Sequence, residues 1–144
     1  MLESGIYSKE RLDISTLVND LLAEKHPENV GAIVTFLGIV KKSGLEGKEV
    51  DRIEMESYEE HASKTIQKIC REVEAKYGAT SVRIYHMIGK FKVGDPLVFV
   101  IVTAQNRSQA IPALEEAIHR YKTEPALWKK EVYVDETSQW ISHA

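Results

Sequence analysis

The sequence predicts an α+β fold with a mostly antiparallel sheet and three main helices. Helical and strand-like segments follow one another in the order α-β-β-α-β-β-α-β-β, so β-α-β alternations are few. Consecutive strands favour antiparallel hairpins, whereas a doubly wound parallel sheet needs a helix in each connection. The length of 144 residues suits one compact domain, and no repeat, low-complexity tract or linker divides the chain. We therefore expect residues 1–144 to form a single domain.

The first half of the chain is expected to hold two helices and two strands. Residues 13–24 carry apolar side chains at helical spacing behind Asp13, which can cap a helix. The apolar, β-branched segment 31–40 is typical of a buried strand, and a charged, glycine-rich loop separates it from a second strand at 50–58. A long helix follows over residues 59–77. The apolar stripes of the two helices are Ile14, Leu17, Val18, Leu21 and Leu22, and Ala62, Ile66, Ile69, Cys70, Val73 and Tyr77.

The second half is expected to add two strands, a third helix and a hairpin. One strand alternates over residues 82–88, and the apolar segment 96–104 is typical of a buried strand. Ser108 can cap a helix that reaches about Lys122. The apolar stripe of this helix would be Ile111, Leu114, Ile118 and Tyr121. Residues 132–134 and 140–142 are expected to form the last hairpin.

Composition and charge narrow the classes of function. The net charge of −3 argues against a nucleic-acid partner, because nucleic-acid-binding domains usually carry a basic surface. The single cysteine, Cys70, permits no disulfide within the chain and fits a reducing compartment. Neither a signal-peptide core nor an apolar run of about 18 residues occurs, so we expect a cytoplasmic protein without a membrane partner.

Sequence motifs for phosphate-loop, nucleophile-elbow or metal chemistry are absent. No G-x-x-x-x-G-K-[ST], G-x-G-x-x-G or G-x-S-x-G occurs, and the five histidines form no i,i+4 pair. We therefore expect neither a metal nor a cofactor. Cys70 lies on a helix stripe and is expected to be a small core residue. His86 lies at an inward strand position, where a hydrogen-bonded core histidine is expected.

Basic and polar side chains follow three apolar elements, and each set opens a loop. The sets are Lys41 and Lys42, then Asn106 and Arg107, then Lys122, Lys129 and Lys130. Loops on a rigid scaffold often carry binding groups, so the three sets could converge on one anion. Each set taken alone is more often a solvated surface.

The segment YKTEPALWKKE, residues 121–131, is the densest of these sets. Pro125 disfavours the helical conformation at the residue before it, so the helix should end there with Lys122 in its last turn. Lys129 follows on an extended segment, and the two amines could point into one pocket. Because Trp128 alternates with Lys129, we expect its ring to face the core. A partly buried lysine beside another cation has a lowered pKa, which suits a base or a nucleophile.

Five blocks in order resemble the large, catalytic subunit of molybdopterin synthase. They are GAIVTFLGIV-K at 31–41, MESYEEHA at 55–62, HMIGKFKVGD at 86–95, VIVTAQNRSQAI at 100–111 and YKTEPALWKKE at 121–131. The last block is the most specific, since two lysines flank a stretch with Pro and Trp and an acidic residue follows. The resemblance covers nearly the whole chain and implies the α/β hammerhead-type fold of that family.

The resemblance implies a concrete activity. The family transfers sulfur to cyclic pyranopterin monophosphate and so makes the dithiolene of molybdopterin. The sulfur arrives as a thiocarboxylate on the C-terminal Gly-Gly tail of a small ubiquitin-like carrier subunit. Two large subunits form a homodimer, and each takes one small subunit, which gives a heterotetramer. The apolar strand at 98–102 is one candidate for the contact between the two copies.

The matching motifs also imply roles for single residues. Lys122 matches the lysine most tied to catalysis, and Lys129 matches the second active-site lysine. Arg107 matches a phosphate-binding arginine that reaches the site of the neighbouring large subunit. Phe36 and Ile118 match positions that line the pocket.

Two substrate-binding positions depart from the family's pattern. Lys41 stands where arginine is usual, which keeps the charge but loses a bidentate fork. Asn106 stands where histidine is usual, which keeps a polar contact but loses an acid–base group.

Two other classes of function stay open from the residues. A non-catalytic adaptor could use the same basic pocket to hold the Gly-Gly tail of a ubiquitin-like partner without any turnover. A nucleotide- or RNA-binding domain could use the same basic loops, although the acidic net charge disfavours it.

Overall fold

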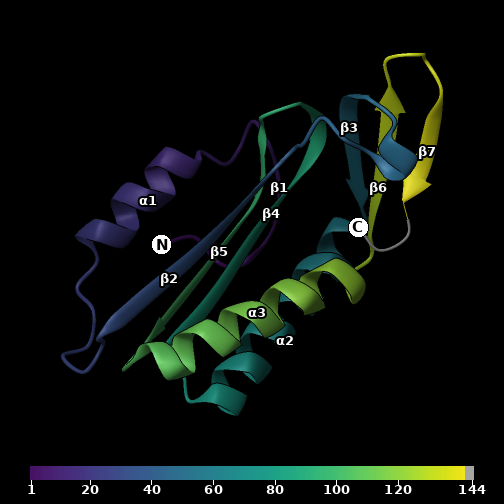
Figure 1. The fold of residues 1–144 in the computed structure, drawn as a ribbon. Coiled ribbons are helices and arrows are strands. Elements are labelled where there is room, and N and C mark those ends of the chain that lie inside the picture. The colour runs from purple at the N-terminus through teal and green to yellow at the C-terminus, as the bar shows by residue number, and fades with distance from the viewer. Residues whose placement is uncertain (142–144) are drawn as a thin grey trace.

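The computed structural model describes residues 1–141, which form one sheet of seven strands with three helices packed on it (Figure 1). The elements in chain order are β1 (Gly5–Ser8), α1 (Ile14–Ala23), β2 (Ala32–Ile39), the short 3-10 helix η1 (Leu45–Gly47), β3 (Val50–Ser57), α2 (Glu59–Tyr77), β4 (Ser81–Lys92), β5 (Pro96–Ala104), α3 (Arg107–Thr123), β6 (Leu127–Tyr133) and β7 (Ser138–Ile141). The strands lie in the order β2-β5-β4-β3-β6-β7, and β1 pairs with β4.

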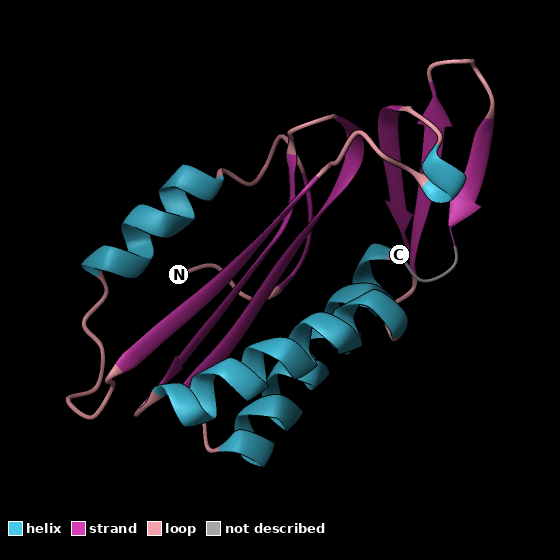
Figure 2. Ribbon diagram, in the orientation of Figure 1, coloured by secondary structure: helices cyan, strands magenta, loops and turns pink. Residues whose placement is uncertain are grey.

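The predicted fold class is confirmed. The strand pairs are antiparallel except for β1 with β4. The helices α2 and α3 lie side by side on one face of the main sheet, and α1 lies on the other face (Figure 2). Each face has its own buried cluster, so alternate side chains of β4 and β5 pack in opposite directions.

A long strand, β4, connects the main sheet with a small sheet formed by β3, β6 and β7. Its first half pairs with β5, and its last residues pair with β3. The change of neighbour occurs around Gly89, whose φ of 127° favours glycine. Figure 1 shows that the small sheet stands beside the C-terminal end of α3. This junction is the place where the YKTEPALWKKE segment crosses from helix to strand.

The predicted elements agree with the structure in kind and differ in detail at several ends. The strand β1 was not predicted, because GIYS is only four residues long and pairs with distant β4. The third helix begins at Arg107 after Asn106 at the N-cap, so the predicted cap at Ser108 is wrong. The strand β6 begins at Leu127, five residues before the predicted 132. Residue 142 of the predicted hairpin lies outside the described residues.

Two predictions about helix burial and one about the contact between copies are wrong. Ile111 is 51% exposed, because small alanines fill the face of α3 that packs on the sheet. Leu22 is 78% exposed, because Leu17 and Leu21 fill the packed face of α1. The strand at 98–102 lies between β2 and β4 with its side chains buried, so it offers no surface to a second copy. The exposed edge of the main sheet is β2 instead. On that strand Ile33, Leu37 and Ile39 are 40%, 46% and 55% exposed.

The described part of the chain has no helix long and apolar enough to cross a membrane. Within residues 1–141 no cluster of histidine, cysteine and acidic side chains could hold a metal ion.

Candidate functional site

A cavity of about 960 Å³ lies at the junction of the two sheets. Its walls come from the end of β2, the loop 41–46, the last turn of α3 and the inner face of β6. A compact ligand of several fused rings fits a space of this size. Four of the seven predicted site residues line it: Phe36, Lys41, Lys122 and Lys129.

The structure brings the amines of Lys41, Lys122 and Lys129 to this one cavity. Burial lowers the pKa of Lys129, and the positive charges of Lys122 and Lys41 lower that pKa further, against the opposing effect of Glu131. The charges therefore act on one another across the cavity. Such a group of amines attracts an anion and makes the neutral amine of Lys129 easier to form.

The strand register of β6 decides which side chains face the buried side of β3, although Trp128 as well as Lys129 borders the cavity. Lys129 pairs with Met55 of β3, whose side chain is buried, whereas Trp128 pairs with Glu56 on the outer face. The indole of Trp128 is 51% exposed, so its predicted place in the core is wrong. Alternation correctly predicted that Trp128 and Lys129 face opposite ways. The buried side of the strand is that of Lys129, however, and not that of Trp128.

A buried carboxylate with no predicted role, Glu131, holds the loop 41–46 over the cavity. Its side chain lines the cavity and is 6% exposed. Its Oε1 accepts a hydrogen bond of 2.9 Å from the N–H of Leu45 and one of 2.8 Å from the hydroxyl of Tyr133. A side chain at Gly44 would bring its Cβ within 2.9 Å of the same oxygen. The signal in the sequence was its position two residues after Lys129, on the same face of β6.

Replacement of Glu131 by alanine is expected to lower the free energy of unfolding by about 1–3 kcal/mol, because the buried hydroxyl of Tyr133 and the part-buried N–H of Leu45 lose their acceptor. Urea denaturation measures the change. The matched control is Glu115→Ala, an exposed glutamate on α3. An equal, small change in both variants would contradict the role given to Glu131.

The other predicted site residues lie elsewhere in the chain. Ile118 packs against the core beneath α3 and does not line the cavity. Asn106 and Arg107 are exposed at the start of α3, and the Asn106 amide oxygen accepts from the Ser108 hydroxyl. Lys122 is 15 residues beyond Arg107 on the same helix, which at about 1.5 Å per residue separates them by about 22 Å along the axis.

The remaining two basic residues of the predicted sets point away. The ammonium of Lys42 pairs with Glu49 at 3.2 Å in an exposed salt bridge. Lys130 lies over the ring of Trp140, 5.6 Å from its centroid, on the outer face of the small sheet. In one copy of the chain, the three sets therefore do not all converge.

The cavity also contacts His86, whose prediction as a buried, hydrogen-bonded residue is confirmed. Its side chain is 4% exposed, and Nδ1 lies 2.9 Å from the carbonyl oxygen of Met87. Burial lowers the pKa of His86 to about 4. The imidazole is therefore neutral at pH 7.

This shift of the His86 pKa predicts a loss of stability in mild acid. Between pH 6.5 and about 4 the unfolded chain takes up a proton at His86 that the folded chain does not bind. The free energy of unfolding should therefore fall as the pH drops through that window, by up to about 3 kcal/mol. Urea denaturation at several pH values tests this, with His86→Gln as the comparison. If both proteins lose stability with the same slope, the assignment to His86 is wrong.

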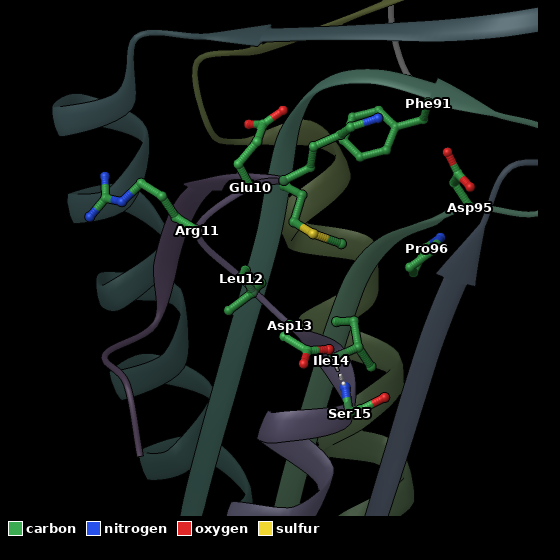
Figure 3. A pocket seen from close by; sticks show the side chains of 11 residues that line it. Glu10, Arg11, Leu12, Asp13, Ile14, Ser15, Phe91, Asp95 and Pro96 are labelled. Atoms are coloured by element: carbon green, nitrogen blue, oxygen red, sulfur yellow. Dashed lines mark hydrogen bonds between the residues drawn. The ribbon is translucent and has the colours of Figure 1, made fainter.

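A second cavity, of about 580 Å³, lies between the β1–α1 loop and the turn between β4 and β5 (Figure 3). Two of its three carboxylates already have local partners. Asp13 caps α1 through the N–H of Ser15 at 3.0 Å, and Asp95 accepts from the N–H of Lys92 at 2.8 Å. None of the predicted site residues lines it.

The fold and the larger cavity together define a class of protein. An α+β chain that brings amines from a loop, a helix end and a strand to one cavity is suited to bind a small anionic ligand.

The family within that class follows from comparison with known proteins. The family model described as MoaE protein matches residues 7–124, so the chain belongs to the MoaE family. The molybdopterin synthase catalytic subunit of Bacillus subtilis is 36% identical over 135 residues, 92% of this chain and 85% of that relative. The rat subunit of the same name is 31% identical over 110 residues, 76% of this chain. The chain spans only 54% of the length of the rat protein.

Solved structures have the same fold. The molybdopterin synthase of Staphylococcus aureus matches with a TM-score of 0.84 and 29% identity over 99% of both chains. A complex of subunits 1 and 2 of the molybdopterin-converting factor from Helicobacter pylori matches with a TM-score of 0.72, over 99% of this chain and 90% of that one. The identity to the latter is 19%, so that likeness concerns the fold alone.

Proposed function

We propose that this chain is the catalytic subunit of a molybdopterin synthase. It transfers sulfur from the C-terminal thiocarboxylate of a small ubiquitin-like carrier subunit to cyclic pyranopterin monophosphate and forms the molybdopterin dithiolene. The observation that carries the proposal is the convergence of Lys41, Lys122 and Lys129 on one cavity in a member of the MoaE family. A cyclic phosphate and a thiocarboxylate are both anions, and both suit such a site.

The three amines have different tasks in this proposal. Lys122 exchanges a proton with the reacting groups or forms a transient covalent link to substrate or carrier. Lys129 holds the phosphate or the thiocarboxylate and stabilises the charge that develops during transfer. Burial lowers its pKa, which makes loss of its proton easier. Lys41 adds charge at the mouth, and Phe36 forms an apolar wall.

The proposed assembly is a homodimer in which each copy binds one carrier subunit. The Bacillus subtilis relative is named a catalytic subunit, and that name supports a further, different subunit as the partner. Two observations on this chain support the dimer. Arg107 lies about 22 Å along α3 from the cavity of its own copy, and the β2 edge exposes Ile33, Leu37 and Ile39. A second copy would cover the edge and bring its Arg107 and Asn106 to the neighbouring cavity.

The compartment in which we propose that this reaction takes place is the cytoplasm. The single cysteine, Cys70, is buried and fits a reducing compartment.

The test is a reconstituted reaction. The purified chain is mixed with a thiocarboxylated carrier and cyclic pyranopterin monophosphate, and molybdopterin is detected by the fluorescence of its oxidised derivative. Product formation supports the synthase. Carrier binding by gel filtration without product would contradict the proposal and favour a non-catalytic adaptor.

A further inference from the structure

The inner wall of the larger cavity holds two polar rings that have no task in the proposed sulfur transfer. His86 comes from β4, and Tyr121 comes from α3, directly before Lys122. Both line the cavity, although only 4% and 5% of their surfaces are exposed. The centroids of the two rings are 5.5 Å apart and the planes are inclined by 60°. The rings therefore form a fixed wall at the base of the cavity.

The hydrogen bond of His86 determines which nitrogen can act on a ligand. The Met87 carbonyl oxygen only accepts, so Nδ1 must donate to it across the 2.9 Å contact. The buried ring is neutral at pH 7, because burial lowers its pKa to about 4. A neutral imidazole with its proton on Nδ1 has an unprotonated Nε2, which is a hydrogen-bond acceptor.

This acceptor is free to meet a ligand. Within residues 1–141, the contacts of His86 include no hydrogen bond at Nε2. In the described part of the chain, the buried side-chain atoms without a hydrogen-bond partner are Ser57 Oγ and Gln109 Oε1. Nε2 is not one of them, so it is not sealed away from solvent without a partner. Since His86 lines the cavity and its Nδ1 is bonded to Met87, we infer that Nε2 opens onto that space.

An acceptor on this wall distinguishes one part of a ligand from another. The ammonium groups around it can only donate, and the Oε1 of Glu131 already accepts from Leu45 and Tyr133. A phosphate or a thiocarboxylate at pH 7 offers acceptor oxygens or sulfur and suits the lysines. A pterin ring carries N–H donors and needs an acceptor, because a buried N–H without a partner costs free energy.

We propose that Nε2 of His86 accepts a hydrogen bond from an N–H group of the pterin ring and so orients the substrate at the base of the cavity. The inference rests on the proposed function, since it takes the pterin as the substrate. It assigns a position in the cavity to each end of the ligand. The pterin ring lies at His86, and the anionic group lies at the lysines. No proton is transferred at His86 in this role.

Two substitutions separate the acceptor from the packing of the ring. His86→Phe keeps a planar ring and removes the acceptor, whereas His86→Gln returns an amide oxygen near the position of Nε2. Ile69→Val, on the buried face of α2 and outside the cavity, is the control for a small loss of core packing.

The measurements are the dissociation constant of cyclic pyranopterin monophosphate without carrier, and KM and kcat with the thiocarboxylated carrier. His86→Phe should weaken pterin binding and raise its KM by at least about 10-fold, with a smaller change in kcat and unchanged carrier affinity. His86→Gln should recover much of the affinity, and Ile69→Val should bind the pterin as the wild type does. The pH profile of kcat/KM between pH 5 and 8 should have the same shape in wild type and His86→Gln.

Three results would overturn the inference. The first is pterin binding that His86→Phe leaves unchanged, or that Ile69→Val weakens equally. The second is an inflection between pH 5 and 8 that His86→Gln abolishes, since His86 would then transfer a proton. The third is a wild-type chain that does not bind the pterin. Binding that depends on His86 without any sulfur transfer would support the inference while the proposed synthase fails.

Discussion

Replacing Lys122 by alanine is expected to slow molybdopterin formation at least about 100-fold while the fold stays intact. Lys122 is exposed in the last turn of α3, and it lines the cavity together with Lys129, whose pKa its positive charge lowers. Loss of the amine removes a group for proton exchange or covalent linkage, and both tasks contribute to the transition state. Little stability should be lost, because the truncated side chain is on the surface. Product fluorescence measures the rate, and thermal unfolding checks the fold.

The control for Lys122→Ala is Lys130→Ala. Lys130 carries the same charge on the neighbouring strand, but it lies over Trp140 on the outer face of the small sheet. Its removal changes the net charge equally without touching the cavity. A rate near that of the wild type in Lys122→Ala, or an equal loss in Lys130→Ala, would refute the assignment.

Arg107→Ala is expected to be nearly inactive alone and to regain activity when it is co-expressed with Lys122→Ala. The helix α3 separates the two residues by about 22 Å along its axis, so we expect each cavity to use its own Lys122 and the Arg107 of the other copy. In a mixed dimer one cavity then carries both changes and the other carries neither. With random pairing, half of the dimers are mixed, so about a quarter of the wild-type activity should return.

The alternative arrangement gives a different result in the same experiment. If Arg107 served its own cavity, each cavity of a mixed dimer would carry one defect, and co-expression would restore nothing. Separately purified mixed dimers, selected by two different affinity tags, should show half the wild-type activity per dimer. Activity no higher than that of the single variants would show that Arg107 does not act across the dimer.

The sequence predicted the fold well where local patterns decide it. The helix α2 lies at residues 59–77 as predicted, because its apolar stripe and the glycine after Tyr77 act within the segment itself. The strand β1 escaped prediction because its pairing with β4 depends on residues about 80 positions away. The face of β6 could not be predicted either. Period-two alternation fixes which residues share a face, and only the packing of β3 and the loop determines which face is buried.

The candidate site was predicted in part. Lys122, Lys129, Lys41 and Phe36 do line one cavity. The helix end and the extended segment after Pro125 made this foreseeable for the first two, whereas Phe36 came only from the family resemblance. Glu131 and His86 were not assigned to the site. A charged side chain next to two lysines is unremarkable in a sequence, and so is a histidine within a strand. Their importance depends on contacts across the fold, with Leu45 for the first and Tyr121 for the second.

The exposed β2 edge has a consequence for how this protein behaves in a cell. A strand edge with free backbone groups and three large apolar side chains is a template for aggregation. In the proposed dimer, the contact that delivers Arg107 to the neighbouring cavity would also shield this edge. A variant that weakened the contact would therefore lose activity and become prone to precipitate at the same time. Protein quality control would then remove such copies because their β2 edge is exposed, and catalysis depends on the same edge. Selection for activity and selection against aggregation would therefore act together on β2.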